Sequence, residues 1–160
     1  MVETFDERFR EIQPAAHSFA KSILHHASDA EDSVQNAAVK AISSFDRYDP
    51  SRPFKAWFFK ILKNCCLDRL RKSQREQTNA YEEETSSNHQ GGSAAELSQE
   101  VEWCMARISS AHQEILRLRY FAEMTYADMA DYLEIPNGTV MSRLHAARIA
   151  FADQHGEYDD

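Results

Sequence analysis

The sequence predicts an all-α protein of two small helical domains joined by a flexible linker. Apolar residues recur with the 3.6-residue period of an amphipathic helix on both sides of the chain's centre. The 160 residues include only four Gly and four Pro, and long runs of Val, Ile and Thr that would favour β-strands are absent. A polar, Gly/Ser-rich stretch from Thr85 to Ser93 interrupts the helical pattern and separates the halves.

These patterns divide the chain into four parts. We expect a helical domain over residues 1–77, an acidic linker over 78–95, a second helical domain over 96–152 and an acidic tail over 153–160. Hydrophobic residues make up 42% of the chain, which is enough to build compact cores. No apolar stretch approaches the ~20 residues that span a bilayer, and the acidic N-terminus does not resemble a secretory signal. We therefore expect a cytoplasmic protein without membrane insertion.

The net charge of −8 conceals a strong asymmetry along the chain. Between Arg52 and Gln77 the basic residues outnumber the acidic ones, which are only Asp68 and Glu76. The predicted linker contains no Lys or Arg, and the tail is acidic as well. The basic segment is the part of the chain that suits a polyanionic partner.

Capping residues predict where several helices begin. Thr4 with Glu7, and Ser28 with Glu31, each have the spacing of a capping box. The second helix should bury an apolar side made of Val34, Ala37, Ala38, Ala41, Ile42 and Phe45. Thr125 with Asp128 forms an aspartate variant of the same box in the second half.

The second half has the pattern of a helix-turn-helix motif. A helix beginning at Thr125 is followed by a turn over residues 135–138, which contains Gly138, and Thr139 is placed to cap the next helix. Val140 and Leu144 are core positions of that last helix. The remaining positions, together with Thr125, are candidates for contact with duplex DNA: Asn137, Thr139, Met141, Ser142, Arg143, His145 and Arg148. The pattern also fits an ordinary helical hairpin.

The segment from Phe45 to Lys72 interleaves aromatic and basic residues. Such a mixture suits single-stranded DNA, because unstacked bases lie on aromatic rings while cations bind phosphates. The alternative is that Phe54, Phe58 and Ile61, at helical spacing, pack in the core. The loop residues are freer to contact a base: Arg47, Tyr48, Asp49, Ser51 and Arg52.

Nothing in the sequence predicts catalysis. Cys65, Cys66 and Cys104 lack zinc-ligand spacing, and we expect reduced thiols, some of them in the core. His17, His25 and His26 lack the spacing of helical metal ligands. No nucleophile elbow, phosphate-binding Gly loop or paired carboxylate site is present. We therefore expect no catalytic residue, no metal and no cofactor.

Several motifs, in the right order, resemble those of one family. Residues 29–35 (DAEDSVQ) are similar to the DAEDxVQ signature of extracytoplasmic-function (ECF) sigma factors, which are of the sigma-70 family. Residues 45–58 (FDRYDPSRPFKAWF) resemble the segment that follows it, and Asn64 with residues 68–72 resembles its N...DxxR ending. Residues 113–120, 125–130 and 135–148 resemble the family's region-four domain.

The resemblance implies an alternative sigma factor that directs core RNA polymerase to promoters. Region two would bind the β′ clamp through Asp29, Asp32, Gln35 and Asn36, and region four would bind the β flap. Region two would also capture a flipped base of the −10 element, through residues that we list as Arg47, Tyr48, Asp49, Ser51, Arg52, Lys55, Trp57, Lys60, Lys63, Asn64, Arg69, Arg71 and Lys72. Region four would read the −35 element, and an anti-sigma factor is an expected partner.

Three positions depart from the family pattern. Asn36 stands where Glu is usual, and Met141 and Ala146 stand where the recognition helix usually carries cations. Fewer cations release fewer counterions, so we expect weak duplex binding with a shallow salt dependence.

Two other functions fit part of the pattern. One is a sigma-like decoy that binds an anti-sigma factor, and the other is a stand-alone helix-turn-helix regulator. A closed free form is also expected, because faces meant for polymerase would otherwise be open to solvent.

Overall fold

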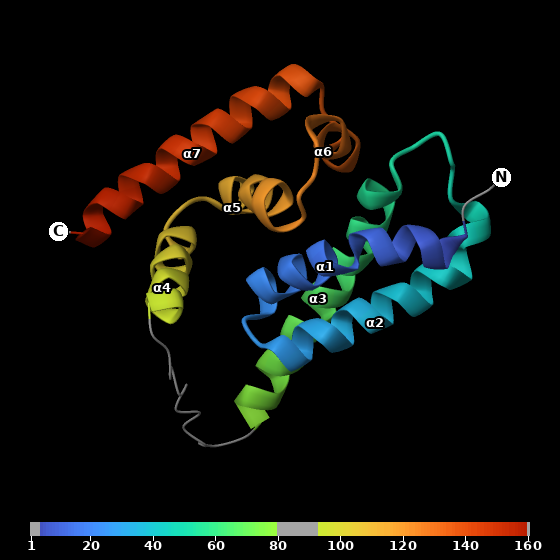
Figure 1. Cartoon of the computed structure of the whole chain (residues 1–160). Helices are drawn as coiled ribbons and strands as arrows, with labels where there is room; N and C mark the ends of the chain where they lie inside the picture. Colours follow the sequence, from blue (N-terminus) through green and yellow to red (C-terminus); the bar gives the residue numbers. More distant parts are fainter. Residues whose placement is uncertain (1–3, 80–92, 160) are drawn as a thin grey trace.

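The structure, a computed structural model, describes residues 4–79 and 93–159, and every regular element in those ranges is helical. The N-terminal domain contains α1 (Phe5–Leu24), α2 (Ala27–Ser44), the short 3₁₀ turn η1 (Phe45–Arg47) and α3 (Phe54–Asn79). The C-terminal domain contains α4 (Ser93–Ala106), α5 (Ser110–Leu116) with its π-helical continuation η2 (Arg117–Phe121), α6 (Tyr126–Leu133) and α7 (Asn137–Asp159). The predicted all-α fold of two helical domains is confirmed (Figure 1).

The N-terminal domain is a bundle in which α1, α2 and α3 pack against one another. Its centre holds Phe19, Phe58, Phe59 and Leu62, each with 2% or less of its surface exposed. Phe19 and Phe59 meet edge to face with ring centroids 5.2 Å apart, an arrangement that aromatic quadrupoles favour. Phe54 and Phe58 are core residues as the helical spacing predicted, whereas Ile61 is only half-buried.

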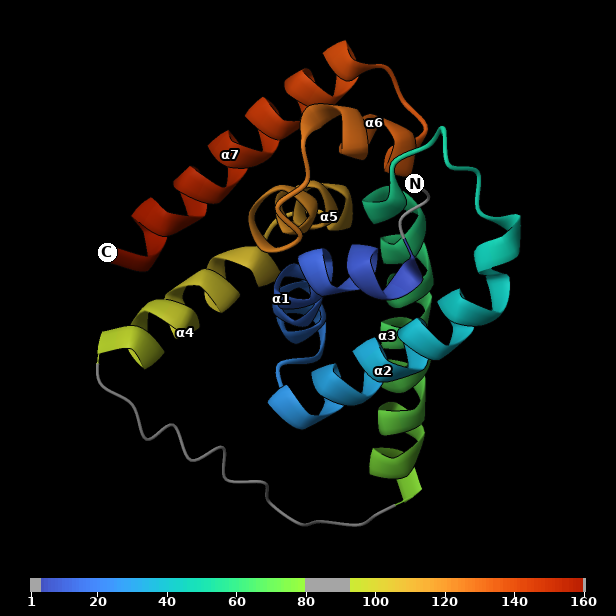
Figure 2. The ribbon, with the colours of Figure 1, turned by 45° about the vertical axis from the view of Figure 1, so that its right-hand side comes forward.

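The C-terminal domain buries one side of each of its helices. Leu118, Met124 and Met129 are fully buried, and Val140 with Leu144 supplies the core side of α7. α7 packs against α4, α5 and α6. Figures 1 and 2 both show α5 and α6 between α7 and the N-terminal domain. One face of α7 therefore points away from the rest of the molecule.

Of the three predicted capping boxes, two form and one does not. Thr4 and Thr125 both form capping boxes, with Glu7 and Asp128. The box predicted at Ser28 does not form: α2 already begins at Ala27, because α1 ends in a left-handed cap at His25 and leaves only His26 as a connection.

The predicted turn of the helix-turn-helix motif lies a few residues too late. The left-handed residue is Glu134, at φ 56°, and α7 begins at Asn137, so that Gly138 and Thr139 are helical. Val140 donates its backbone N–H to the carbonyl of Pro136 at 3.1 Å. Pro136 has the fixed φ that suits a helix start, which explains the earlier beginning. At its other end α7 continues through residues 153–159, where we expected a separate acidic tail.

The three cysteines are buried free thiols. Burial raises the pKa of the Cys66 thiol to about 12, with smaller effects from Cys65 and from a hydrogen bond with Ser33. Cys66 is therefore protonated at neutral pH, which agrees with the expectation of core thiols.

Removing the Phe58 ring is expected to destabilise the N-terminal domain. Phe58 is fully buried between α1 and its own helix, so Phe58→Ala should lower the free energy of unfolding by about 3–5 kcal/mol. Urea unfolding followed by circular dichroism measures the change. Asn64→Ala, on the exposed side of the same helix, is the matched control and should change stability by less than ~0.5 kcal/mol. Equal effects of the two substitutions would contradict this assignment of the core.

Candidate nucleic-acid and polymerase interfaces

An aromatic cluster supports the loop between η1 and α3. The rings of Tyr48 and Trp57 lie 4.9 Å apart, and Phe45 stacks on Tyr48 at 5.9 Å. Tyr48 is only 7% exposed, and its hydroxyl donates a hydrogen bond to the carbonyl of Arg52. Burial is the main cause that raises the pKa of Tyr48. The expectation that Tyr48 is free to contact a base is wrong in this arrangement, because its ring fills the space beneath the loop. Trp57 remains half-exposed.

The loop itself is held in a fixed shape. Asp49 accepts hydrogen bonds from the Ser51 backbone N–H at 3.0 Å and from the Ser51 hydroxyl at 2.7 Å. These bonds favour the carboxylate and lower the pKa of Asp49. Arg47, Ser51 and Arg52 are left exposed along the loop.

Four predicted DNA contacts face the C-terminal domain instead of open solvent. Arg52 binds Asp131 through Nε and Nη2, both at 3.1 Å, and this pair raises the pKa of Arg52. Lys55 donates to the backbone carbonyl of Glu123 at 3.1 Å. The remaining two contacts are ion pairs, Lys60 with Glu134 at 3.8 Å and Lys63 with Glu114.

The other basic residues of α3 lie elsewhere on the helix. Arg69 donates to Asp29 of α2 at 2.7 Å. We expected Arg69 to contact DNA and Asp29 to contact polymerase, but in the free chain they bind each other. Arg71 pairs with Asp68 of its own helix at 3.1 Å. Asn64 and Lys72 are exposed.

The outer side of α2 is a mixed polar and apolar face. Asp32, Gln35 and Asn36 are exposed as predicted for a binding surface. Val39 is 64% exposed and Ile42 is 56% exposed on the same side. The prediction that Ile42 belongs to the buried side is wrong: its place on the helix is beside Gln35 and Val39, away from the stripe of Val34, Ala37 and Ala41. The exposure of Val39 beside these polar residues was not predicted from the sequence, and exposed apolar area of this kind favours an interaction surface.

The exposed face of α7 carries the predicted duplex contacts. Asn137, Ser142, Arg143 and His145 are exposed, and Met141 is 55% exposed. Thr139 is half-buried.

Two of the predicted duplex contacts have internal partners. Arg148 donates from Nε to the Tyr120 hydroxyl at 2.7 Å, which raises its pKa. The Thr125 hydroxyl accepts from the Asp128 N–H at the start of α6, so it acts as a cap.

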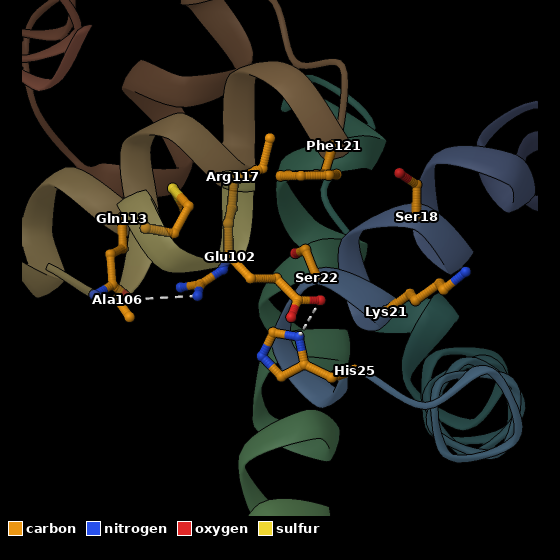
Figure 3. A pocket seen from close by; sticks show the side chains of 11 residues that line it. Ser18, Lys21, Ser22, His25, Glu102, Ala106, Gln113, Arg117 and Phe121 are labelled. Carbon is orange, nitrogen blue, oxygen red and sulfur yellow. Dashed lines mark hydrogen bonds and ion pairs between the residues drawn. The ribbon is translucent and has the colours of Figure 1, made fainter. Parts of the chain in front are cut away.

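Two cavities are formed by residues far apart in sequence, and the sequence analysis missed both. One, of about 510 Å³, lies between α1 and the C-terminal domain (Figure 3). His25 and Glu102 approach to 3.3 Å at its edge. Arg117 also lines it; burial lowers the pKa of this guanidinium, which donates to Gln113 at 3.3 Å. The second cavity, of about 360 Å³, lies between α4, η2 and α7 and is lined mainly by apolar side chains such as Met105, Tyr120 and Phe151.

Neither a metal site nor a membrane span is found in the described ranges. No three His, Cys, Asp or Glu side chains among residues 4–79 and 93–159 gather closely enough to hold an ion. No helix within these ranges is long and apolar enough to cross a bilayer.

The two helical domains match two family models. Residues 8–76 match sigma-70 region 2, and residues 98–151 match sigma-70 region 4. The ECF RNA polymerase sigma factor EcfG of Rhodopseudomonas palustris is 30% identical over 139 residues, covering 84% of this chain and 76% of that protein. SigW of Bacillus subtilis, also named an ECF sigma factor, is 26% identical over 146 residues, covering 82% and 78%.

Solved structures agree with this fold. The sigma factor RpoE of Bartonella quintana, determined with the anti-sigma factor NepR, matches with a TM-score of 0.68 and 25% identity over 96% of this chain and 97% of that one. CnrH, determined with the cytosolic domain of CnrY, matches with a TM-score of 0.70 over 93% and 85% at 23% identity. The chain belongs to the ECF sigma factors of the sigma-70 family, which initiate transcription at promoters with core RNA polymerase.

Adding a cation to the exposed face of α7 should strengthen binding to duplex DNA. Met141 is exposed beside Ser142 and His145, so Met141→Arg places a guanidinium where a phosphate can be reached. One added phosphate contact should steepen the slope of log K against log salt by about 0.9. Fluorescence anisotropy with a labelled promoter duplex measures the slope. Met141→Leu is the control. An unchanged slope for Met141→Arg would show that this face of α7 does not contact the phosphates of duplex DNA.

Proposed function

We propose that the N-terminal domain captures the unpaired strand of the −10 element on the loop before α3. The observation that carries this proposal is a loop fixed by Asp49 and Ser51, with the exposed cation Arg47 before it. The half-exposed ring of Trp57 packs on Tyr48 under this loop, and Arg52 of the loop pairs with Asp131 in the free chain. A base stacked on an aromatic ring and phosphates bound by cations are the contacts that single-stranded DNA requires. Lys55, Lys60 and Lys63 are proposed to extend this surface along α3. Asn64, Arg71 and Lys72, on other parts of the same helix, are proposed to bind the strand further along.

The exposed face of α7 is proposed to read the −35 element as a duplex. The N-terminal turns of a recognition helix enter the major groove, while its opposite side packs in the domain. Val140 and Leu144 are the packed side, and Ser142, Arg143 and His145 are the open side. Arg148 and Thr125, which have internal partners, are better suited to contact the backbone than the bases.

The outer face of α2 is proposed to bind the β′ clamp of core polymerase. Asp32, Gln35 and Asn36 supply polar contacts, and Val39 and Ile42 supply apolar area that is exposed in the free chain. Asp29, bound to Arg69, is proposed to hold α2 against α3. The cavity lined by Met105, Tyr120 and Phe151 is the apolar surface on which the β flap would bind.

An anti-sigma factor is proposed as a further partner. The matching RpoE and CnrH structures are complexes, with NepR and with the cytosolic domain of CnrY. The cavity between α1 and the C-terminal domain offers a surface of mixed polarity at the domain boundary. A factor that acts on chromosomal promoters with core polymerase works in the cytoplasm, which is the location that we propose.

Run-off transcription with core polymerase and a library of promoter fragments tests the proposed DNA contacts. Wild-type protein should yield specific transcripts, and Arg143→Ala and Arg47→Ala should each reduce them by about ten-fold, because each removes a contact worth about 1–3 kcal/mol. Arg10→Ala, exposed on α1, is the matched control and should leave transcription unchanged. Absence of transcripts, together with binding to an anti-sigma protein, would favour a decoy.

Charge on the outer face of α2 should weaken polymerase binding without unfolding the chain. Val39 is 64% exposed, so Val39→Glu buries no charge in the free protein. It should raise the Kd for core polymerase at least ten-fold, because an apolar contact would be replaced by a desolvated charge. Surface plasmon resonance with immobilised core enzyme measures the Kd. Glu31→Gln, exposed near the start of α2, is the control, and equal affinities of all three proteins would contradict the proposal.

A further inference from the structure

Three carboxylates of the C-terminal domain form one surface toward α3. Glu114 comes from α5, Asp131 from α6 and Glu134 from the turn that follows α6; we call them the acidic face. Their partners are Lys63, Arg52 and Lys60, respectively. All three partners belong to the basic segment that the proposed function assigns to the −10 element. The acidic face therefore occupies cations that single-stranded DNA would bind.

Apolar packing holds the same surface together. Tyr132 of α6 is 6% exposed, and the Lys60 ammonium lies 5.9 Å from the centre of its ring. Burial raises the pKa of the Tyr132 phenol, with a smaller contribution from Glu114. α3 contacts α6 and α1 contacts η2, so the two domains share a boundary at more than one place. The closed arrangement is thus built from both charge and packing.

Two residues at the ends of local turns contribute to this surface. Glu123 and Glu134 both have a left-handed backbone, at φ 55° and 56°. This region favours Gly, and a residue with a side chain is strained there. Such strain persists where surrounding contacts offset it. Local backbone hydrogen bonds stabilise both positions, since Glu134 caps α6 and the Met124 N–H bonds the Leu118 carbonyl. Lysines of α3 contact the same two residues: Lys55 donates to the Glu123 carbonyl and Lys60 pairs with the Glu134 carboxylate.

The strength of these contacts suits a reversible closure. The paired side chains are partly exposed, with 51% and 23% for Arg52 and Asp131 and 41% and 75% for Lys60 and Glu134. Exposed ion pairs are individually weak and are screened by salt. A polyanion that offers several phosphates at once can therefore displace the carboxylates. By contrast, α7 lies apart from α1, α2 and α3 (Figure 2), and its residues Ser142 and Arg143 are exposed.

We propose that the acidic face is an internal mimic of promoter DNA, which binds Arg52, Lys60 and Lys63 in the free chain and is displaced by the −10 strand. The proposal rests on the proposed function of these cations. The free protein is then closed and binds single strands poorly, while its duplex-reading helix remains available. Opening of the two domains precedes capture of the unpaired strand.

Neutralising the acidic face tests the proposal. The variant Glu114→Gln, Asp131→Asn and Glu134→Gln keeps the side-chain shapes and removes three negative charges. The matched control Glu11→Gln, Glu31→Gln and Asp153→Asn removes the same charge at exposed positions away from α3. Small-angle scattering measures the radius of gyration, and anisotropy measures binding of a labelled 12-nucleotide single strand at about 50 mM salt, where screening is weak.

Wild type and control should be compact, with a radius of gyration near the ~15 Å of a folded chain of this length. The acidic-face variant should expand and bind the single strand at least ten-fold more tightly than the control does. A variant that stays compact, or that expands without a gain in affinity over the control, would overturn the proposal.

A charge exchange provides a second test. Asp131→Arg should open the chain by repelling Arg52, and the double variant Asp131→Arg with Arg52→Asp should be compact again because the pair is restored. Failure of the double variant to close would overturn the proposal. Failure of the proposed function would be seen separately, as wild-type protein that gives no specific run-off transcript whatever its shape.

Discussion

The contact between the basic side of α3 and the carboxylates Glu114, Asp131 and Glu134 sets how the two domains of the free chain lie against each other. Although its net charge is −8, the chain concentrates cations in one helix and the loop before it, which are the segments proposed to bind the −10 strand. The same concentration attracts the chain's own acidic residues, because opposite charges near each other in a folded protein pair wherever geometry allows. In the proposed function, domain arrangement and DNA binding are coupled through the same side chains.

The loop before α3 depends on packing more than on charge. Tyr48 is buried beneath it and hydrogen-bonds the Arg52 carbonyl, while Asp49 and Ser51 fix its turn. A loop held in one conformation loses little entropy when a ligand binds, which is the advantage of preorganisation. The aromatic cluster thus connects the core of the N-terminal domain to the cations that the loop exposes.

Local patterns predicted the helices and most of the core, because the 3.6-residue period reports which side is buried. Capping boxes at Thr4 and Thr125 form as predicted, since their partners lie three residues away. The errors arise where residues distant in sequence decide whether a side chain is buried or paired. Ile42 is exposed although it is apolar, and Tyr48 is buried although it lies in a loop. The pairing of Arg52 with Asp131, 79 residues apart, and the cavity between α1 and the C-terminal domain depend on tertiary arrangement, which periodicity does not contain.

The central claim is that the two domains separate when the chain acts on a promoter. Fluorescent labels at Glu11 of α1 and Asp153 of α7, both exposed, allow the distance between the domains to be followed by energy transfer. The labelled chain is measured free, with core polymerase, and with core polymerase and promoter DNA. The account predicts a short distance in the free chain and a longer one in the promoter complex. An unchanged distance in a complex that makes specific transcripts would contradict it.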